Sequence, residues 1–253
     1  MATGSHTGVA NSPTVHSINV ELSAATCSTV PVTRAASDAL AQRVKVHAAL
    51  GEPVRLAIVD ELAACDRSPR ELGERLDLSA SLLAHHLDVL AEAGLVTRGR
   101  SHADRRRRYL RLTDSAQAFA QPVQVDAARP VVFLCTHNSA RSQLAAAIWT
   151  RRVGGPASSA GTAPADRVHP EAVAAGQRAG LDLTGSRPRV IERLDTASQV
   201  VTVCDSVHEV LPVRDDWWHW SIADPIVSEA PEAFDAVVHE IHHRIDHLMG
   251  GPS

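Results

Sequence analysis

The stretch from Phe133 to Trp149 constrains the fold of this chain more than any other, and it reads FLCTHNSARSQLAAAIW. An apolar run typical of a buried strand ends on Cys135, a short polar loop follows, and a helical pattern begins at Arg141. The backbone N–H groups of such a loop can surround a tetrahedral oxyanion, with the positive end of the helix dipole behind them. Because the same field favours a thiolate, the sequence predicts a nucleophilic cysteine beneath a bound anion.

The side chains of this loop fit the same chemistry. Arg141 offers planar, bidentate donors to two oxygens of the anion, and the Ser142 hydroxyl can stabilise the thiolate. Asn138 tolerates the left-handed backbone conformation that a tight anion-binding turn needs. We therefore predict Cys135, Arg141 and Ser142 as catalytic residues. The predicted oxyanion-binding loop consists of Thr136, His137, Asn138, Ser139, Ala140 and Arg141.

From residue 131 onward, strand and helix patterns alternate along the chain, in the order PVVFLC, SQLAAAIWTRR, ASSAGT, HPEAVAAGQRAG, QVVTVC and PEAFDAVVHEIHHRIDHLM. Such alternation predicts an α/β domain with a doubly wound parallel sheet, which binds ligands beyond the carboxyl ends of its strands. Cys135 lies at one of these ends. The segment WWHW at 217–220 either lines the entrance of the site or covers the edge of the sheet.

Residues 37–119 have a different, mainly helical pattern. Two short helices, the first with a capping box at Ser68 and the second with an N-cap at Ser79 and a stop at Gly94, predict a helix-turn-helix. Two extended segments around a basic turn then predict a β-wing. Positions 98–111 hold seven arginines against one aspartate, although the whole chain has a formal charge of -4. Any contact with a polyanion is therefore expected at the wing.

These patterns divide the 253 residues into two domains of different class. A winged helix-turn-helix domain, mainly α with a small β part, is predicted at 37–119, a linker at 120–130, and the α/β domain at 131–253. Residues 1–36 are rich in Ser, Thr, Ala and Gly without periodicity, and we predict a disordered tail there.

The composition limits where the protein can be located in the cell and which cofactors it can bind. No apolar run approaches the roughly 18 residues of a membrane span, and no secretory signal pattern is present, so we expect a cytoplasmic protein without a membrane partner. The four cysteines are far apart and form no CxxC pair, which argues against a disulfide scaffold and a structural zinc site. They are Cys27, Cys65, Cys135 and Cys204. No bound metal or cofactor is expected.

The first domain resembles the ArsR-type family of winged-helix repressors over about residues 38–118, through ALGEPVRLAIVDEL and LSASLLAHHLDVLAEAGLVTRGR. The resemblance implies a homodimer on a palindromic double-stranded DNA operator, with the second helix of the motif in the major groove and the wing on phosphates or in the minor groove. The predicted DNA-binding residues are Ala80, Ser81, Ala84, His85, Arg100, Arg105, Arg106, Arg107 and Arg108.

One departure from that family concerns its metal box. The family's common Cys-x-Cys pair is absent, and DRSPREL stands in its place. Cys65 lies just upstream and Cys27 lies in the tail. The two thiols either trap arsenite across a dimer or are unrelated to sensing.

The second domain resembles the low-molecular-weight protein tyrosine phosphatases and the arsenate reductases that share their fold, over residues 131–249. The loop after Cys135 carries this resemblance, together with SSAGT at 158–162 and ADP at 223–225. It implies that Asp224 is the general acid that protonates the leaving group.

Smaller features favour the reductases over the phosphatases. Phosphatases of this family usually carry aromatic residues directly after the Asp-Pro pair, whereas this chain reads DPIVSEA. Arsenate reduction needs a second thiol to attack the Cys135–arsenic adduct. Cys204 is the candidate within the domain, but a further cysteine expected near DSVHEVLP is absent, which favours an external low-molecular-weight thiol or a redoxin.

The sequence therefore predicts an arsenic-responsive DNA-binding regulator fused to a thiol-dependent arsenate reductase that binds arsenate or phosphate. Two alternatives remain. The first is a low-molecular-weight protein tyrosine phosphatase with a DNA-binding domain, and the second is a non-catalytic repressor that senses an oxyanion or its redox state.

Overall fold

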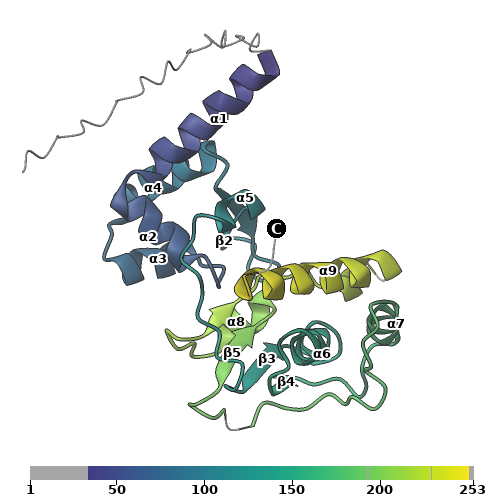
Figure 1. Ribbon diagram of the computed structural model, residues 1–253. Coiled ribbons are helices and arrows are strands. Elements are labelled where there is room, and N and C mark those ends of the chain that lie inside the picture. The colour runs from purple at the N-terminus through teal and green to yellow at the C-terminus, as the bar shows by residue number, and fades with distance from the viewer. Residues whose placement is uncertain (1–33, 193, 229, 251–253) are drawn as a thin grey trace, which may run out of the picture.

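The computed structural model describes residues 34–192, 194–228 and 230–250, which form two units in contact with each other (Figure 1). Most of the predicted tail at 1–36, with Cys27, lies outside the described residues. Within the described ranges, no helix is long and apolar enough to cross a membrane.

The first unit is a group of helices with a two-stranded wing. Its helix starts are those that the sequence predicts, because Ser68 and Glu71 form the capping box and the Ser79 hydroxyl accepts the Leu82 N–H. Gly94 follows the second helix of the motif with a φ of 72°, the left-handed value that a helix stop needs. In chain order the elements are α1 (Arg34–Leu50), α2 (Pro53–Glu61), α3 (Pro69–Leu76), α4 (Ala80–Glu92), β1 (Val96–Arg100), β2 (Arg108–Leu112) and α5 (Asp114–Gln117).

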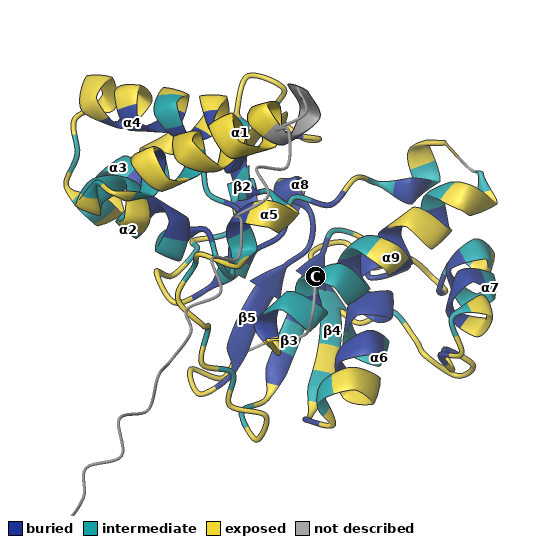
Figure 2. Cartoon of the chain, turned by 45° about the horizontal axis from the view of Figure 1, so that its top comes forward, coloured by how far each residue is buried: buried dark blue, intermediate teal, exposed yellow. Residues whose placement is uncertain are grey.

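The core of this unit lies between α2, α3, α4 and the wing. β1 and β2 pair in antiparallel register, from Val96 opposite Leu112 to Arg100 opposite Arg108. The core includes Ile58, Val59, Leu72, Leu83, Leu90 and Leu110, all nearly inaccessible to solvent. By contrast α1 is mostly exposed (Figure 2).

The second unit is a parallel four-stranded sheet with helices packed on it. The strand order is β4-β3-β5-β6, so β3 and β5 are central. Cys135, at the end of β3, lies opposite Gly161 at the end of β4. The elements are β3 (Val131–Cys135), α6 (Arg141–Val153), β4 (Ala157–Gly161), α7 (Pro170–Arg178), β5 (Gln199–Thr202), α8 (Asp205–Val210), β6 (Trp218–His219), η1 (Pro225–Val227) and α9 (Pro231–Leu248).

Large apolar side chains join the sheet to its helices. The Phe133 ring of β3 lies 5.9 Å, between centroids, from both Trp149 of α6 and Trp220 beyond β6. Burial of such aromatic side chains is among the largest favourable terms in a core of this size. Because these contacts fix α6 against β3, they also fix the loop between the two elements, which contains the candidate active site.

The edge strand β6 faces the first unit. The Asp66 N–H donates to the His219 carbonyl at 2.7 Å, and the Trp220 indole N–H donates to the Ala64 carbonyl at 2.9 Å. Within WWHW, Trp218 and His219 form the edge strand β6 itself rather than cover the edge of the sheet, and the first unit lies against this strand.

A buried ion cluster lies at the centre of the contact between the two units. Asp66 is 2 % exposed, and its carboxylate accepts two hydrogen bonds from Arg244 of α9, at 2.8 and 2.7 Å. Arg111 of β2 donates to the same carboxylate at 3.3 Å. Burial raises the pKa of Asp66, but the two arginines outweigh burial and lower it to about 2. The first unit is therefore held to the second by charges that are costly to separate.

Candidate active site and DNA-binding surface

The thiol of Cys135 lies beneath the loop that joins β3 to α6. Its Sγ atom is 3.0 Å from the Ser142 hydroxyl and accepts the backbone N–H of Asn138 at 3.1 Å. The residue is 3 % exposed. One backbone N–H thus donates to the sulfur, and the Ser142 hydroxyl lies within hydrogen-bond distance of it, at the start of α6.

Asn138 determines the shape of the loop. Its φ is 47°, the left-handed conformation predicted for this position. The Asn138 amide donates to the Ser142 hydroxyl at 2.8 Å and accepts from Gln143 at 3.1 Å and from the Arg189 backbone N–H at 2.8 Å. These bonds compensate the cost of a left-handed non-glycine residue and fix the turn in one conformation.

The carbonyl groups of the loop point away from the thiol. Those of Thr136, His137 and Ser139 accept backbone N–H groups from the segment after β4, at 2.9, 2.9 and 2.8 Å. Within the described residues, the N–H groups of His137, Ser139 and Ala140 have no protein acceptor, and no side chain caps the start of α6. Unpaired N–H groups around a helix N-terminus form an anion-binding site.

Gly161 permits this loop to approach β4. A Cβ atom at position 161 would lie 2.5 Å from the Thr136 carbonyl oxygen and 3.0 Å from the Asn138 nitrogen. Only glycine leaves room for a backbone contact this close. The SSAGT segment, which carries part of the resemblance to the phosphatase family, therefore packs closely against the loop through Gly161.

Arg141 and Asp224 meet at the opening of the site, although 83 residues separate them in sequence. One terminal nitrogen of Arg141 donates to Asp224 Oδ2 at 2.7 Å, and the other donates to the Ile222 carbonyl at 3.0 Å. Asp224 also accepts the Ile226 N–H at 3.1 Å, which orients its carboxyl group. The structure thus brings the predicted acid to the predicted anion-binding arginine.

Cys204, the possible resolving thiol, lies beside the loop at the start of α8. Its Sγ atom is 3.6 Å from the Thr136 hydroxyl, and its side chain is buried. Burial and, to a smaller extent, the nearby Cys135 raise the pKa of Cys204, against the lowering effect of Arg141. The position permits a role as resolving thiol, while the raised pKa disfavours the thiolate that such a role requires.

The predicted DNA-binding residues lie on α4 and on the wing, and most are open to solvent. Ala80, Ser81, Ala84 and His85 are exposed on the first turns of α4, as are Arg100, Arg105, Arg106 and Arg107 on the wing, and Arg108 is half-buried. Arg106 makes a bidentate pair with Asp104 at 3.0 and 3.2 Å. A pair this exposed is weak, so it leaves Arg106 available to a phosphate.

Cys65, one of the two possible arsenite ligands, is enclosed at the contact between the units. It is 2 % exposed, it accepts the His219 N–H at 3.1 Å, and burial raises its pKa to about 11. A buried neutral thiol is a poor soft-metal ligand. Because Cys27 lies outside the described residues, their pairing stays a prediction.

Contacts that sequence reasoning missed hold the wing to α8. Asp205 Oδ2 accepts the His102 backbone N–H at 2.6 Å, and Glu209 accepts the Ser101 hydroxyl at 2.6 Å and the Asp104 backbone N–H at 3.2 Å. The only sequence signal is the pair of carboxylates that follows Cys204, whose charge complements the basic wing. The wing is thus attached to the helix that begins beside the active site.

Comparison with known proteins agrees with this geometry. Residues 130–251 match the family model of low molecular weight phosphotyrosine protein phosphatases. An arsenate reductase from Brevibacillus brevis is 38 % identical over 124 residues, which cover 46 % of this chain and 91 % of that protein. This chain belongs to the family of these phosphatases and arsenate reductases.

The chain is also similar to other arsenate reductases and, in its first domain, to a helix-turn-helix domain. An arsenate reductase from Bacillus anthracis is 37 % identical over 125 residues, 46 % of this chain and 91 % of that protein. The crystal structure of an arsenate reductase from Archaeoglobus fulgidus has 31 % identity and a TM-score of 0.42, over 47 % of this chain and 98 % of that one. Residues 50–98 match a helix-turn-helix domain model. The predicted fusion of a helix-turn-helix domain to a phosphatase-type α/β domain is confirmed.

Proposed function

We propose that this chain is an arsenic-responsive DNA-binding regulator fused to a thiol-dependent arsenate reductase. The observation that carries the proposal is the Cys135 thiol, 3.0 Å from the Ser142 hydroxyl and 3.1 Å from the Asn138 nitrogen, in a loop with unpaired N–H groups. Such a loop binds a tetrahedral oxyanion and holds a nucleophile below it.

The chemistry follows from the positions of the side chains. The Cys135 thiolate attacks the arsenic atom of arsenate, and one oxygen leaves as water after protonation by Asp224. Arg141 and the loop N–H groups hold the remaining oxygens. A second thiolate then attacks the Cys135 sulfur, so that an S–S bond forms, the S–As bond breaks, and the electron pair reduces arsenic to arsenite. Arsenate and two thiols thus give arsenite, one disulfide and water.

The environment of Asp224 supports arsenate over an aryl phosphate. The residues that follow the Asp-Pro pair are Ile226 and Val227, and Val227 is 87 % exposed. No aromatic side chain in this segment can stack on a phenol ring. The phosphatase alternative uses the same nucleophile and acid, so it stands as the second candidate. The non-catalytic alternative does not account for the contact between Asp224 and Arg141, because sensing needs no proton donor.

The reductant in this proposal is an external thiol, either a low-molecular-weight thiol or a redoxin. Cys204 is buried and its pKa is raised, both of which slow attack on Cys135. The domain itself requires no bound cofactor in this scheme.

In the cytoplasm, the winged-helix domain would bind a palindromic operator as a homodimer. Support for a dimer comes from α1, whose Leu40 and Val44 are 57 % and 59 % exposed. Exposed apolar side chains on one helix are typical of an interface. The inducer would act on this dimer, and arsenite, the product of the second domain, is the candidate.

The test compares two reactions on the same preparation of the full chain. Arsenate-dependent oxidation of glutathione or of a thioredoxin system should exceed hydrolysis of p-nitrophenyl phosphate, and Asp224→Asn should slow both. Rapid hydrolysis of the aryl phosphate without arsenate-dependent oxidation of any thiol would establish the phosphatase alternative instead.

A further inference from the structure

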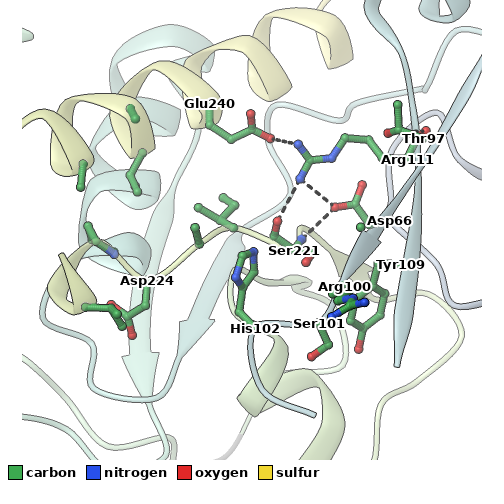
Figure 3. Close-up of a pocket in the computed structure, with 18 of the residues that line it drawn as sticks. Asp66, Thr97, Arg100, Ser101, His102, Tyr109, Arg111, Ser221, Asp224 and Glu240 are labelled. Carbon is green, nitrogen blue, oxygen red and sulfur yellow. Dashed lines mark hydrogen bonds and ion pairs between the residues drawn. The ribbon is translucent and has the colours of Figure 1, made fainter. Parts of the chain in front are cut away.

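A cavity of about 1030 Å³ lies between the wing and the loop that carries Asp224 (Figure 3). One wall belongs to the first unit and includes Arg100, His102 and Arg105 of the wing. The other wall belongs to the second unit and includes Asp224 and the first turns of α9. The cavity therefore opens onto the acid of the active site, and its size suits a small organic molecule rather than a protein.

The arginines that line this cavity differ in their partners. Arg98 pairs with Asp88 at 2.7 Å, and Arg111 pairs with Glu240 at 2.7 Å. Among the described residues, no carboxylate lies within 4.0 Å of the guanidinium nitrogens of Arg100 or Arg105. These two cations on one wall are available to an anionic ligand.

The opposite wall is largely apolar. It is formed by Ile222, Ala223, Pro225 and Val227 before α9, and by Ala233 and Val237 within it. A ligand that fits both walls has carboxylate groups at one side and an uncharged chain along the other.

The cavity has a fixed frame. The bonds from the wing to Asp205 and Glu209 of α8 hold His102 and Ser101 in place, and the Tyr109 hydroxyl adds a contact to Glu209 at 3.3 Å. Because the cationic wall is held by the catalytic domain itself, ligand binding requires little ordering of the wing.

We propose that this cavity binds the reductant of the second domain, a low-molecular-weight thiol with carboxylate groups. The carboxylates pair with Arg100 and Arg105, the chain follows the apolar wall, and the sulfur passes Asp224 to reach Cys135. This inference rests on the proposed function. The thiolate of the bound molecule attacks the Cys135 sulfur and releases arsenite, and a second molecule of the thiol reduces the mixed disulfide, so that the thiol leaves as its own disulfide.

The first experiment measures binding without turnover. S-methylglutathione, a dicarboxylate whose sulfur cannot react, is titrated calorimetrically into the full chain. Binding should weaken at least about tenfold in Arg100→Gln/Arg105→Gln, equivalent to the loss of a single charge-assisted contact. Arg70→Gln is the matched control, because its side chain is 88 % exposed and pairs with Glu74 outside the cavity. Binding in Arg70→Gln should equal that of the parent.

The second experiment measures arsenate-dependent thiol oxidation. In the double variant the ratio of the KM for glutathione to the KM for uncharged 2-mercaptoethanol should rise about tenfold, which a general loss of structure would not produce. The inference is overturned if the parent does not bind S-methylglutathione, or if the double variant binds it as tightly as the parent does. Binding without arsenate-dependent oxidation of any thiol would instead refute the proposed function.

Discussion

The loop after Cys135 and the basic wing both gather positive charge for an anion, but they do so in opposite ways. In the loop, a few backbone N–H groups and one arginine that is 7 % exposed surround a single buried site. In the wing, seven arginines are spread over positions 98–111, and most are exposed. Electrostatic interactions are strong in an enclosed site and are screened on a surface. A single substitution in the loop should therefore strongly reduce anion binding or turnover. In the wing, only several substitutions together should clearly weaken DNA binding.

The loop is where the largest effects of single substitutions are expected. Cys135→Ser should reduce arsenate turnover by about 10⁴-fold or more, because the nucleophile is lost. Phosphate binding should survive, since the loop N–H groups and Arg141 remain. Arg141→Ala should lose both turnover and phosphate binding. Thiol oxidation and calorimetric titration with phosphate measure the two properties, and equal phosphate affinity in Arg141→Ala and the parent would contradict this account of the loop.

The wing should require several substitutions for a clear effect. Replacement of Arg105, Arg106, Arg107 and Arg108 by Ala should weaken binding to all duplexes and reduce the slope of log K against log salt by up to about 3 to 4, because each phosphate contact contributes about 0.9. A single Arg106→Ala should change that slope by 1 or less. DNA binding should be measured by fluorescence anisotropy with the full chain. A fragment of the first unit alone would expose Asp66, which is buried against the second unit. An unchanged slope in the fourfold variant would remove the wing from the DNA interface.

The buried ion cluster between the units should make stability depend on acid. The pKa of Asp66 falls from 3.8 to about 2 on folding, and a carboxyl whose pKa is lower in the folded chain stabilises it above its unfolded pKa. That contribution, on the order of 2 kcal/mol, is lost as pH falls from about 4 to 2. Urea titrations at pH 6, 4 and 3 should show the free energy of unfolding decreasing, and less steeply in Asp66→Asn. The same decrease in both proteins would place the acid sensitivity elsewhere.

The smallest effect is expected at Cys204. With glutathione as reductant, Cys204→Ser should keep turnover within about threefold of the parent, because the buried thiol is not the attacking group in this scheme. Mass spectrometry after single turnover should then find glutathione on Cys135 in both proteins. Lost turnover in Cys204→Ser, with a Cys135–Cys204 disulfide in the parent, would show that the internal thiol resolves the adduct.

How much of the site the sequence can predict depends on how far apart its residues lie in the chain. The loop could be predicted because Cys135, Asn138, Arg141 and Ser142 lie within eight consecutive residues, and local backbone geometry decides what they do. Asp224 was reached only through a family resemblance, since 83 residues separate it from Arg141.

Contacts between the units could not be predicted from the sequence. The bond from His102 to Asp205 joins residues 103 positions apart, and no periodicity or spacing encodes it. The helix α8 has six residues, too few for a helical pattern to predict it, and no motif in the sequence indicates that the Gln143 amide donates to Asn138. The position of WWHW stayed open because its partner, Ala64, lies in the other unit.

Whether Cys135 reduces arsenate is decided by the amount of arsenite that the protein forms. Arsenate and glutathione are incubated with equal concentrations of the parent, Cys135→Ser or no protein, and arsenite is separated from arsenate by chromatography and quantified by elemental mass spectrometry. Arsenite should form with the parent in proportion to the oxidised glutathione, and Cys135→Ser should give no more than the sample without protein. Equal arsenite from the parent and Cys135→Ser would contradict the central claim that this thiol reduces arsenate.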